Sequence, residues 1–283
     1  MAKNNNDKRS KAAKQTLAEQ ADKFRCYQLS VQAPEHETEF FEQAYRDVHP
    51  GKKPLALRED FCGTFAVCCQ WVKEGKQRTA LGVDLCGETL QWGRDHNLAP
   101  LKRSQSDRVK ILQQDVRQTN RPKADVLSAQ NFSFWIFKTR EELLHYFRIA
   151  RSNLKKGGIM VMDMMGGYEC YVEEHVDKRT IKKGKNGFQY HWEQRRFDPL
   201  SGDAVFSISF RFADGSKLKR AFQYEWRFWS VPEVRELLAE AGFRASHIYM
   251  AEEEENGQDT GNWIRTKTAG NDASWLAYIV AEK

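Results

Sequence analysis

The sequence lacks an apolar run of the roughly 20 residues that a membrane-spanning helix needs. Its first residues, MAKNNNDKRSKAAK, are polar throughout and contain no apolar stretch of the kind found in a secretory signal. The six cysteines include no C-x-x-C pair, which disfavours a structural metal site and a disulfide framework. We therefore expect a cytoplasmic protein that binds no metal and has no membrane partner.

A strong charge excess is missing from most of the chain. The net charge is +6, but residues 1–25 contain seven Lys or Arg and three acids, so they account for +4 and leave +2 for residues 26–283. A nucleic-acid site needs basic residues spread over a folded face. The distribution predicts a basic, mobile tail over residues 1–25 and a folded domain over residues 26–283, and it disfavours nucleic acid as a partner.

Apolar runs bounded by turn residues alternate with helical patterns over much of the folded part. Strands separated by helices of this length are typical of a parallel sheet with helices on both faces. The sequence thus predicts a Rossmann-like α/β fold with a doubly wound, mostly parallel, seven-stranded sheet that ends in an edge hairpin. The predicted strands are 54–57, 79–85, 109–113, 124–129, 159–164, 246–250 and 274–280, and the predicted helices are 12–27, 35–48, 64–74, 87–96, 140–153 and 231–241.

The pattern changes between residues 187 and 227, where apolar and polar residues alternate along the chain. This alternation is interrupted at residues 199–203 and at Asp214-Gly215, which are typical hairpin turns. We interpret the segment as an antiparallel β insertion after strand five. Because strand five ends at the ligand-binding edge of such a sheet, the insertion is expected to act as a lid.

The turn after the first predicted strand contains two acids instead of the glycine pattern of a dinucleotide fold. Glu59 and Asp60 precede Cys62, Gly63 and Thr64. No G-x-G-x-x-G follows the strand, which disfavours NAD. Carboxylates beside the turn also argue against a pyrophosphate, which prefers N–H donors, and they suit a cofactor that carries an ammonium group.

The next two predicted strands end in further acids at the same edge of the sheet. Asp84 lies 21 residues beyond Gly63 (84 minus 63), where dinucleotide folds place an acid that accepts hydrogen bonds from ribose hydroxyls. The third strand runs into Gln114, Asp115 and Val116, where a carboxylate and the following backbone N–H can pair with an adenine amine. These positions indicate a nucleoside-type cofactor.

In their order and spacing these segments resemble the class I S-adenosylmethionine-dependent methyltransferases of the small-molecule type. The resemblance rests on LREDFCGT, ALGVDL, ILQQDV, ADVLSAQNFSF, NLKKGGIMVMD and WSVPEVRELLAEAGF, which cover most of Leu55 to Phe243. It implies that S-adenosylmethionine is the cofactor and that its methyl group passes to a nitrogen or oxygen of a small molecule. The cofactor-binding residues that it predicts are Tyr27, Glu59, Asp60, Cys62, Gly63, Asp84, Leu85, Asp115, Val116, Asn131 and Phe132.

The resemblance leaves some of these assignments open. Phe61 and Phe65 replace the glycines that flank the family's loop, so the backbone path there is not settled by the resemblance. Either Glu59 or Asp60 is the acid that meets the methionine ammonium. Tyr27 either folds over the cofactor, as N-terminal segments do in similar enzymes, or packs at the surface.

An amine or hydroxyl acceptor also has to lose a proton, and three residues from different loops are candidates for taking it. Asn131 follows the fourth strand beside the expected methyl group, Tyr168 follows the fifth strand, and His191 lies in the insertion. The insertion's aromatic and arginine side chains are expected to wall a pocket for a small, anionic or aromatic acceptor: Tyr190, Trp192, Arg211, Trp226 and Arg227.

Two other functions remain open at this point. A methyltransferase acting on RNA or protein needs an open face of basic and aromatic residues, and a lid over the cleft disfavours it. A non-catalytic protein that binds S-adenosylmethionine as a partner or regulator is disfavoured by the intact acids. The sequence predicts no oligomeric state.

Overall fold

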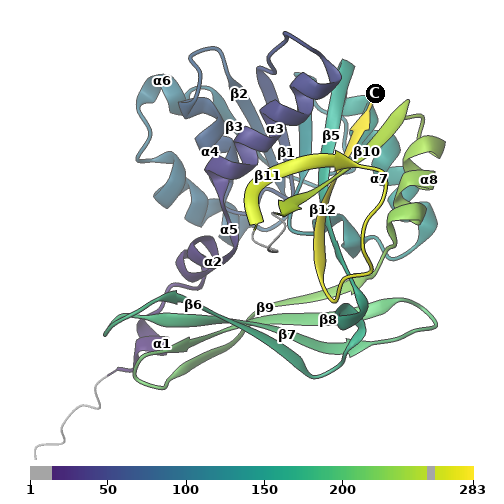
Figure 1. Ribbon diagram of the computed structural model, residues 1–283. Helices are drawn as coiled ribbons and strands as arrows, with labels where there is room; N and C mark the ends of the chain where they lie inside the picture. Colours follow the sequence, from purple (N-terminus) through teal and green to yellow (C-terminus); the bar gives the residue numbers. More distant parts are fainter. Residues whose placement is uncertain (1–14, 254–258) are drawn as a thin grey trace, which may run out of the picture.

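The computed structural model describes residues 15–253 and 259–283, which form two sheets and the helices around them. Figure 1 shows the larger sheet with helices on both of its faces and the smaller sheet as a separate layer across one end. Within the described ranges, no helix is long and apolar enough to cross a membrane.

The larger sheet consists of β1 (Ala56–Asp60), β2 (Thr79–Asp84), β3 (Val109–Gln113), β4 (Ala124–Ala129), β5 (Leu154–Gly166), β10 (Ala245–Glu253), β11 (Asp259–Thr266) and β12 (Trp275–Glu282). Their order across the sheet is β11-β10-β12-β5-β4-β1-β2-β3. The strands from β3 to β5 run parallel, whereas β12, β10 and β11 are added by antiparallel pairing. The chain order reverses between β1 and β4, and open α/β sheets bind ligands in the crevice at such a point.

The predicted α/β class with a doubly wound, mostly parallel sheet is confirmed, with one strand more than expected. The additional strand, β11, has the sequence DTGNWIRT, in which Gly261 and several polar residues hide the alternation of a half-buried strand. The last two predicted strands are antiparallel neighbours, as expected for a hairpin. However, β12 lies between β5 and β10, so the last strand in sequence is internal to the sheet.

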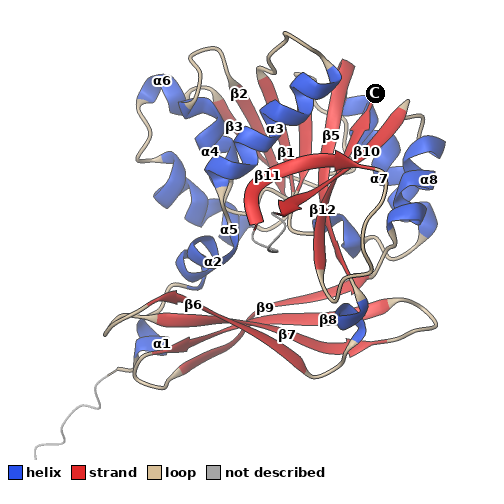
Figure 2. Cartoon of the chain, viewed as in Figure 1, coloured by secondary structure: helices blue, strands red, loops and turns tan. Residues whose placement is uncertain are grey.

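Side-chain alternation along the parallel strands explains why helices cover both faces (Figure 2). In β4 and β5, Leu127 and Met160 belong to one buried cluster, whereas Val126 and Ile159 belong to another on the opposite face. The first cluster is covered by α7 and α8, and the second by α3 and α4. The helices and helical turns of this part are α3 (Pro34–Val48), α4 (Ala66–Lys73), α5 (Gly87–Gly93), η1 (Arg94–Leu98), α6 (Arg103–Ser106), η2 (Ser133–Ile136), α7 (Arg140–Asn153), η3 (Tyr168–Tyr171) and α8 (Val231–Glu240).

The smaller sheet has the antiparallel order β6-β7-β8-β9 and corresponds to the predicted insertion. Its strands are β6 (His175–Lys182), β7 (Phe188–Phe197), β8 (Asp203–Phe212) and β9 (Lys217–Arg227). The insertion therefore begins at His175 rather than near residue 187. The sequence of β6, HVDKRTIK, is dominated by charged residues that are exposed in the fold, so it carries no apolar signal for a strand.

The N-terminal segment contains two short helices, α1 (Leu17–Gln20) and α2 (Lys23–Val31), instead of one helix over residues 12–27. Asp22 separates them because its carboxylate caps α2 by accepting hydrogen bonds from two backbone N–H groups. Leu17 donates its backbone N–H to Asp214 in the β8–β9 turn at 2.8 Å. Residues 15–25 of the predicted tail are thus largely helical and attached to the smaller sheet, while residues 1–14 lie outside the described residues.

Candidate active site

Two adjoining cavities lie at the carboxyl ends of the parallel strands. The smaller, about 240 Å³, follows the turns after β1 and β2. The larger, about 670 Å³, lies between the ends of β4 and β5 and the inner face of the smaller sheet. α2 and α3 contribute to the walls of both. The residues shared by the two cavities are Tyr27, Glu37, Gln130, Asn131 and Tyr224.

The turn after β1 follows a left-handed backbone path although two of its residues are phenylalanine. Phe61, Gly63 and Phe65 have φ of 57°, 53° and 45°. Each non-glycine residue in this region costs about 1 to 2 kcal/mol. Phe65 is fully buried, and a Cβ at Gly93 would lie 2.5 Å from a carbon of its ring. Because Gly93 has no side chain, the Phe65 ring fits against the helix at this position. Burial of the ring offsets the energetic cost of the left-handed backbone.

Glu59 and Asp60 both line the smaller cavity, but their partners differ. Asp60 accepts hydrogen bonds from Arg58 Nε at 2.6 Å and from the Tyr146 hydroxyl at 3.1 Å, so a buried cation already balances its charge. Glu59 accepts from the backbone N–H and the thiol of Cys68, which are neutral. Burial raises the pKa of Glu59 to about 8 and that of Asp60 to about 6. Glu59 is thus the acid that a cationic ligand would complement.

Asp84 closes the smaller cavity from the end of β2. Its carboxylate accepts the backbone N–H groups of Gly63 and Cys86, each at 2.8 Å, and so ties the turn after β1 to the turn after β2. Leu85, the next residue, is 64% exposed, which leaves an apolar side chain beside the carboxylate. Cys62 and Gly63 line the same cavity. The structure therefore brings together this group of predicted cofactor residues.

Asp115 and Val116, the residues predicted to meet adenine, line neither cavity. Asp115 is held in a bidentate pair by Arg117, with the shortest contact at 2.7 Å, and the hydrogen bonds from Arg117 lower the pKa of Asp115. Val116 is buried, and its carbonyl accepts a hydrogen bond from Arg58. In this conformation both residues serve the protein's own contacts.

The turn after β4 is fixed by an acid that the sequence analysis did not single out for binding. Asn131 and Phe132 have φ of 59° and 56°, and both donate their backbone N–H to the carboxylate of Asp163 on β5, at 2.8 and 2.9 Å. Burial raises the pKa of Asp163 to about 6. Asn131 lines both cavities and Phe132 the larger one, so this turn positions them at the junction.

Tyr168 and His191, two of the predicted proton acceptors, are not brought to either cavity. Tyr168 is 59% exposed on η3. His191 lies on the outer face of β7, because neighbouring residues in a strand point to opposite faces and Tyr190 and Trp192 line the larger cavity. Of the insertion's predicted wall residues, Tyr190, Trp192 and Trp226 line this cavity, whereas Arg211 lies with His191 on the outer face.

Tyr27 and Glu37 lie at the junction of the cavities, on α2 and α3. Tyr27 is hydrogen-bonded to Tyr224 of the smaller sheet, so it is a wall of the site rather than a surface residue. Sequence reasoning missed Glu37. A signal was present, because Glu37 stands three and four residues before the buried Phe40 and Phe41, on the apolar face of its helix.

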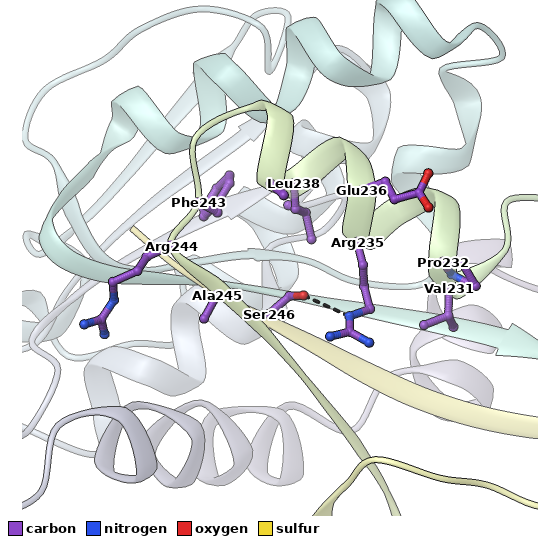
Figure 3. Close-up of a pocket in the computed structure, with 10 residues that line it drawn as sticks. Val231, Pro232, Arg235, Glu236, Leu238, Phe243, Arg244, Ala245 and Ser246 are labelled. Carbon is purple, nitrogen blue, oxygen red and sulfur yellow. Dashed lines mark hydrogen bonds between the residues drawn. The ribbon is translucent and has the colours of Figure 1, made fainter.

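A further cavity of about 480 Å³ lies between α8 and the start of β10 (Figure 3). It shares no lining residue with the two cavities described above. Figure 3 shows the hydrogen bond from Arg235 Nε to the Ser246 hydroxyl, 3.1 Å long, on its wall. Because it borders the beginning of β10 rather than the carboxyl ends of the parallel strands, it lies apart from the candidate site.

No family model and no curated protein match this chain. Solved structures do match over nearly its whole length. An S-adenosylmethionine-dependent methyltransferase from Clostridium acetobutylicum is 15% identical with a TM-score of 0.64, covering 92% of this chain and 96% of that one. The fold is that of the S-adenosylmethionine-dependent methyltransferases.

Two further neighbours share this methyltransferase fold. CalS10, an amino pentose methyltransferase from Micromonospora echinaspora with SAM bound, is 15% identical with a TM-score of 0.63, covering 92% of this chain and 95% of that one. The sugar N-methyltransferase KedS8 from Streptoalloteichus is 16% identical with a TM-score of 0.60, covering 100% and 98%. The likeness therefore includes the smaller sheet as well as the Rossmann-like part.

Proposed function

We propose that this protein is an S-adenosylmethionine-dependent methyltransferase that acts on a nitrogen or oxygen of a small molecule. The observation that carries the proposal is the pair of adjoining cavities: one is lined by acids at the ends of β1 and β2, and the other is walled by aromatic residues under the smaller sheet. Two ligands placed in them would meet at Asn131. The neighbours of the same fold, which are methyltransferases, support this assignment.

The smaller cavity fits a ligand that carries positive charge. Glu59 has no cationic partner among the described residues, and Asp84 keeps lone pairs beyond those used by the two backbone N–H groups. In this proposal Glu59 receives the methionine ammonium and Asp84 the ribose hydroxyls. S-adenosylmethionine supplies, when bound, an electrophilic methyl group and a thioether leaving group. Contact of Asp115 and Val116 with adenine stays a prediction, and Asp115 would have to leave Arg117 to make it.

The larger cavity favours a small acceptor over RNA or protein. Strands β6 to β9 cover it, and nine Phe, Tyr and Trp side chains line it, which is the lining expected for a small ligand rather than a polymer. The protein's role in the transfer is to align the acceptor with the methyl group and to exclude water. The aromatic wall residues are Tyr27, Phe132, Tyr190, Trp192, Tyr224, Trp226, Trp263, Trp275 and Tyr278.

Calorimetric titration with S-adenosylmethionine and S-adenosylhomocysteine tests the cofactor assignment. We expect Asp84→Ala to weaken binding by about 30-fold or more, because a charge-assisted hydrogen bond is worth about 2 kcal/mol. Asp84→Asn removes the charge but keeps the shape of the side chain. Comparison with Asp84→Ala therefore separates the effect of the charge from the effect of losing the contacts that tie the turns after β1 and β2. Asp107→Ala, an exposed acid outside both cavities, is the matched control and should leave the affinity unchanged.

Binding of neither compound by the unmodified protein would overturn the proposed function. Unchanged affinity in both folded Asp84 variants would remove Asp84 from the site. Binding without any methyl transfer to the amines and alcohols described below would favour the non-catalytic alternative.

A further inference from the structure

The junction of the two cavities contains a buried carboxylate oxygen that no described residue satisfies. Glu37 is only 8% exposed, and its Oε2 has no hydrogen-bond partner among the described residues. A buried polar atom without a partner costs about 1 to 3 kcal/mol, and more when the group is charged. Because Glu37 borders both cavities, a ligand placed there can satisfy this oxygen.

The surroundings of Glu37 are acidic rather than basic. The charge of Asp163 raises the pKa of Glu37, and the charge of Glu37 raises the pKa of Glu59. Neither neighbour carries a positive charge. Arg179 is a cation on the wall of the larger cavity, where it stacks on Tyr190 of the same wall at 4.6 Å and donates to the Ser30 carbonyl. Among the described residues it forms no ion pair with Glu37. The other titratable groups that face Glu37 or line the larger cavity are Tyr27, His36, Glu169, Cys170, His175, Asp177, Tyr190, Tyr224 and Tyr278.

The histidine next to Glu37 does not supply the missing cation. His36 Nε2 accepts a hydrogen bond from the indole N–H of Trp263 at 2.8 Å. An indole N–H can only donate, so Nε2 of His36 is occupied as an acceptor and is not available to Glu37. The larger cavity therefore combines four carboxyl groups, on Glu37, Asp163, Glu169 and Asp177, with aromatic walls, which is the combination that attracts an organic cation.

We propose that the methyl acceptor is an amine, that it enters as an ammonium ion bound to Glu37, and that Glu37 takes the proton which frees its nitrogen to react. This inference rests on the methyltransferase function proposed above. It replaces the anionic acceptor expected from the sequence, since Arg211 lies on the outer face and Arg227 stacks on Trp229 at 3.8 Å and donates to the Lys138 carbonyl.

In the proposed reaction, proton transfer to Glu37 precedes methyl transfer. One N–H proton of the ammonium moves to the Glu37 carboxylate, and the nitrogen regains its lone pair. This pair forms the nitrogen–carbon bond while the carbon–sulfur bond breaks and its electrons go to sulfur, giving the thioether. The product leaves as a methylated ammonium ion, and Glu37 returns its proton to water.

The acidity of Glu37 suits an amine better than an alcohol. Burial, with a further contribution from Asp163, raises the pKa of Glu37 to about 7. An aliphatic ammonium has a pKa near 10.4. The difference between this pKa and that of the accepting carboxylate is about 6 for an ordinary glutamate and about 3 for Glu37. A hydroxyl, with a pKa nearer the value of about 16 for water, stays far outside the reach of a carboxylate.

Calorimetry in the presence of saturating S-adenosylhomocysteine tests the inference with three amines and their matched alcohols: benzylamine and benzyl alcohol, cyclohexylamine and cyclohexanol, and glucosamine and glucose. We expect at least one amine to bind the unmodified protein tenfold or more tightly than its alcohol. Glu37→Gln should abolish this preference. Glu39→Gln, an exposed acid on the same helix, is the matched control and should keep it.

A second readout follows the reaction of the amine that binds. Glu37 must be ionised to accept a proton, so kcat/KM should rise between pH 5 and pH 8 in the unmodified protein. Glu37→Gln should lower kcat at least 100-fold and remove this rise, and Glu37→Asp should restore part of both.

The outcomes separate the two proposals. Equal binding of every amine and its alcohol, or an amine preference that survives in Glu37→Gln, would overturn the amine inference while leaving the methyltransferase function intact. Loss of S-adenosylhomocysteine affinity in Glu37→Gln would assign Glu37 to the cofactor and also overturn it. Failure of the unmodified protein to bind S-adenosylhomocysteine would overturn the proposed function itself.

Discussion

Buried carboxylates dominate the chemistry of the candidate site at the scale of single residues. Glu37, Glu59 and Asp163 all have a pKa raised by burial, and among the described residues none forms an ion pair. Asp163 is satisfied by two backbone N–H groups, and Glu59 by Cys68. The Glu37 carboxylate is hydrogen-bonded to the backbone of Ala33, but its Oε2 has no partner among the described residues, and this oxygen destabilises the folded state.

The pH dependence of stability follows from the raised pKa of Glu37. Between pH 4.5 and about 7 the folded state retains the Glu37 proton that the unfolded state has lost, so ionisation of Glu37 lowers stability as the pH rises through this window. Above pH 7 the loss is complete. Glu37→Gln removes this pH-dependent loss of stability. Between pH 5 and pH 8 we expect the free energy of unfolding of the unmodified protein to fall by on the order of 2 to 3 kcal/mol more than that of the variant.

Urea unfolding of both proteins at pH 5 and pH 8, without ligand, measures this difference. Glu39→Gln, which changes an exposed acid, should show no such difference between the two pH values. If Glu37→Gln is no more stable than the unmodified protein at pH 8, Glu37 does not have a buried, unsatisfied carboxylate oxygen in solution.

Single residues were predictable where their position along the chain determines their role. Asp84 and Asn131 follow strands whose ends meet at one edge of the sheet, so the sequence placed both at the site. The left-handed φ of Phe65 depends instead on the space beside Gly93, 28 residues later (93 minus 65), which no local pattern reveals. The place of Glu37 on the apolar face of its helix is a local signal of burial, but the cavities that Glu37 borders depend on the whole fold.

Strand β7 shows how one element separates a site face from a solvent face. Trp192 packs on Phe206, with ring centroids 5.0 Å apart, and lines the larger cavity. His191 lies on the outer face among basic side chains, where burial and the nearby charge of Lys178 lower its pKa. Adjacent residues of the same strand therefore provide a matched pair of variants.

We expect Trp192→Ala to raise KM for the amine acceptor about tenfold, because loss of this partly buried aromatic side chain removes about 1.5 kcal/mol of apolar contact. Affinity for S-adenosylhomocysteine should stay within about twofold. His191→Ala should leave both quantities unchanged. Steady-state kinetics and calorimetry check this, and a larger effect of His191→Ala than of Trp192→Ala would contradict the assignment of the two faces.

Elements with strong periodicity were predictable, and those shaped by tertiary contacts were not. The strands of the parallel sheet are apolar runs between turns, and α7 and α8 carry capping boxes at Thr139 and Ser230, so both kinds of element were found. β6 and β11 are rich in polar and charged residues, and they are strands because β7 and β10 offer edges to pair with.

The two sheets are joined across the site by α2. On one side Trp92 donates its indole N–H to Asp22 at 2.6 Å, and on the other the rings of Tyr27 and Phe222 are 4.9 Å apart. α2 also supplies Phe24 and Tyr27 to the wall of the smaller cavity. Figure 1 shows α2 between the two sheets, which also meet directly where Trp226 of β9 packs on Phe132 and Trp135.

Truncation tests the role of α2 in the whole molecule. Removal of residues 1–14 should keep S-adenosylhomocysteine affinity within about threefold, because it leaves all the described residues that line the cavities in place. Removal of residues 1–31 should lower the affinity at least tenfold, since Phe24 and Tyr27 are lost. Calorimetry on both folded truncations decides, and equal affinity in the two would show that α2 does not close the site.

The central place of β12 has a consequence for how the chain is made. Gly166 at the end of β5 and Trp275 at the start of its partner β12 are 109 positions apart (275 minus 166). At 5 to 20 residues per second a ribosome needs roughly 5 to 20 s to cover that distance. For this time β5, whose residues are largely buried in the finished fold, has one unpaired edge. An unpaired edge can pair with strands of other chains, so the nascent chain is open to aggregation at β5 until β12 has been synthesised.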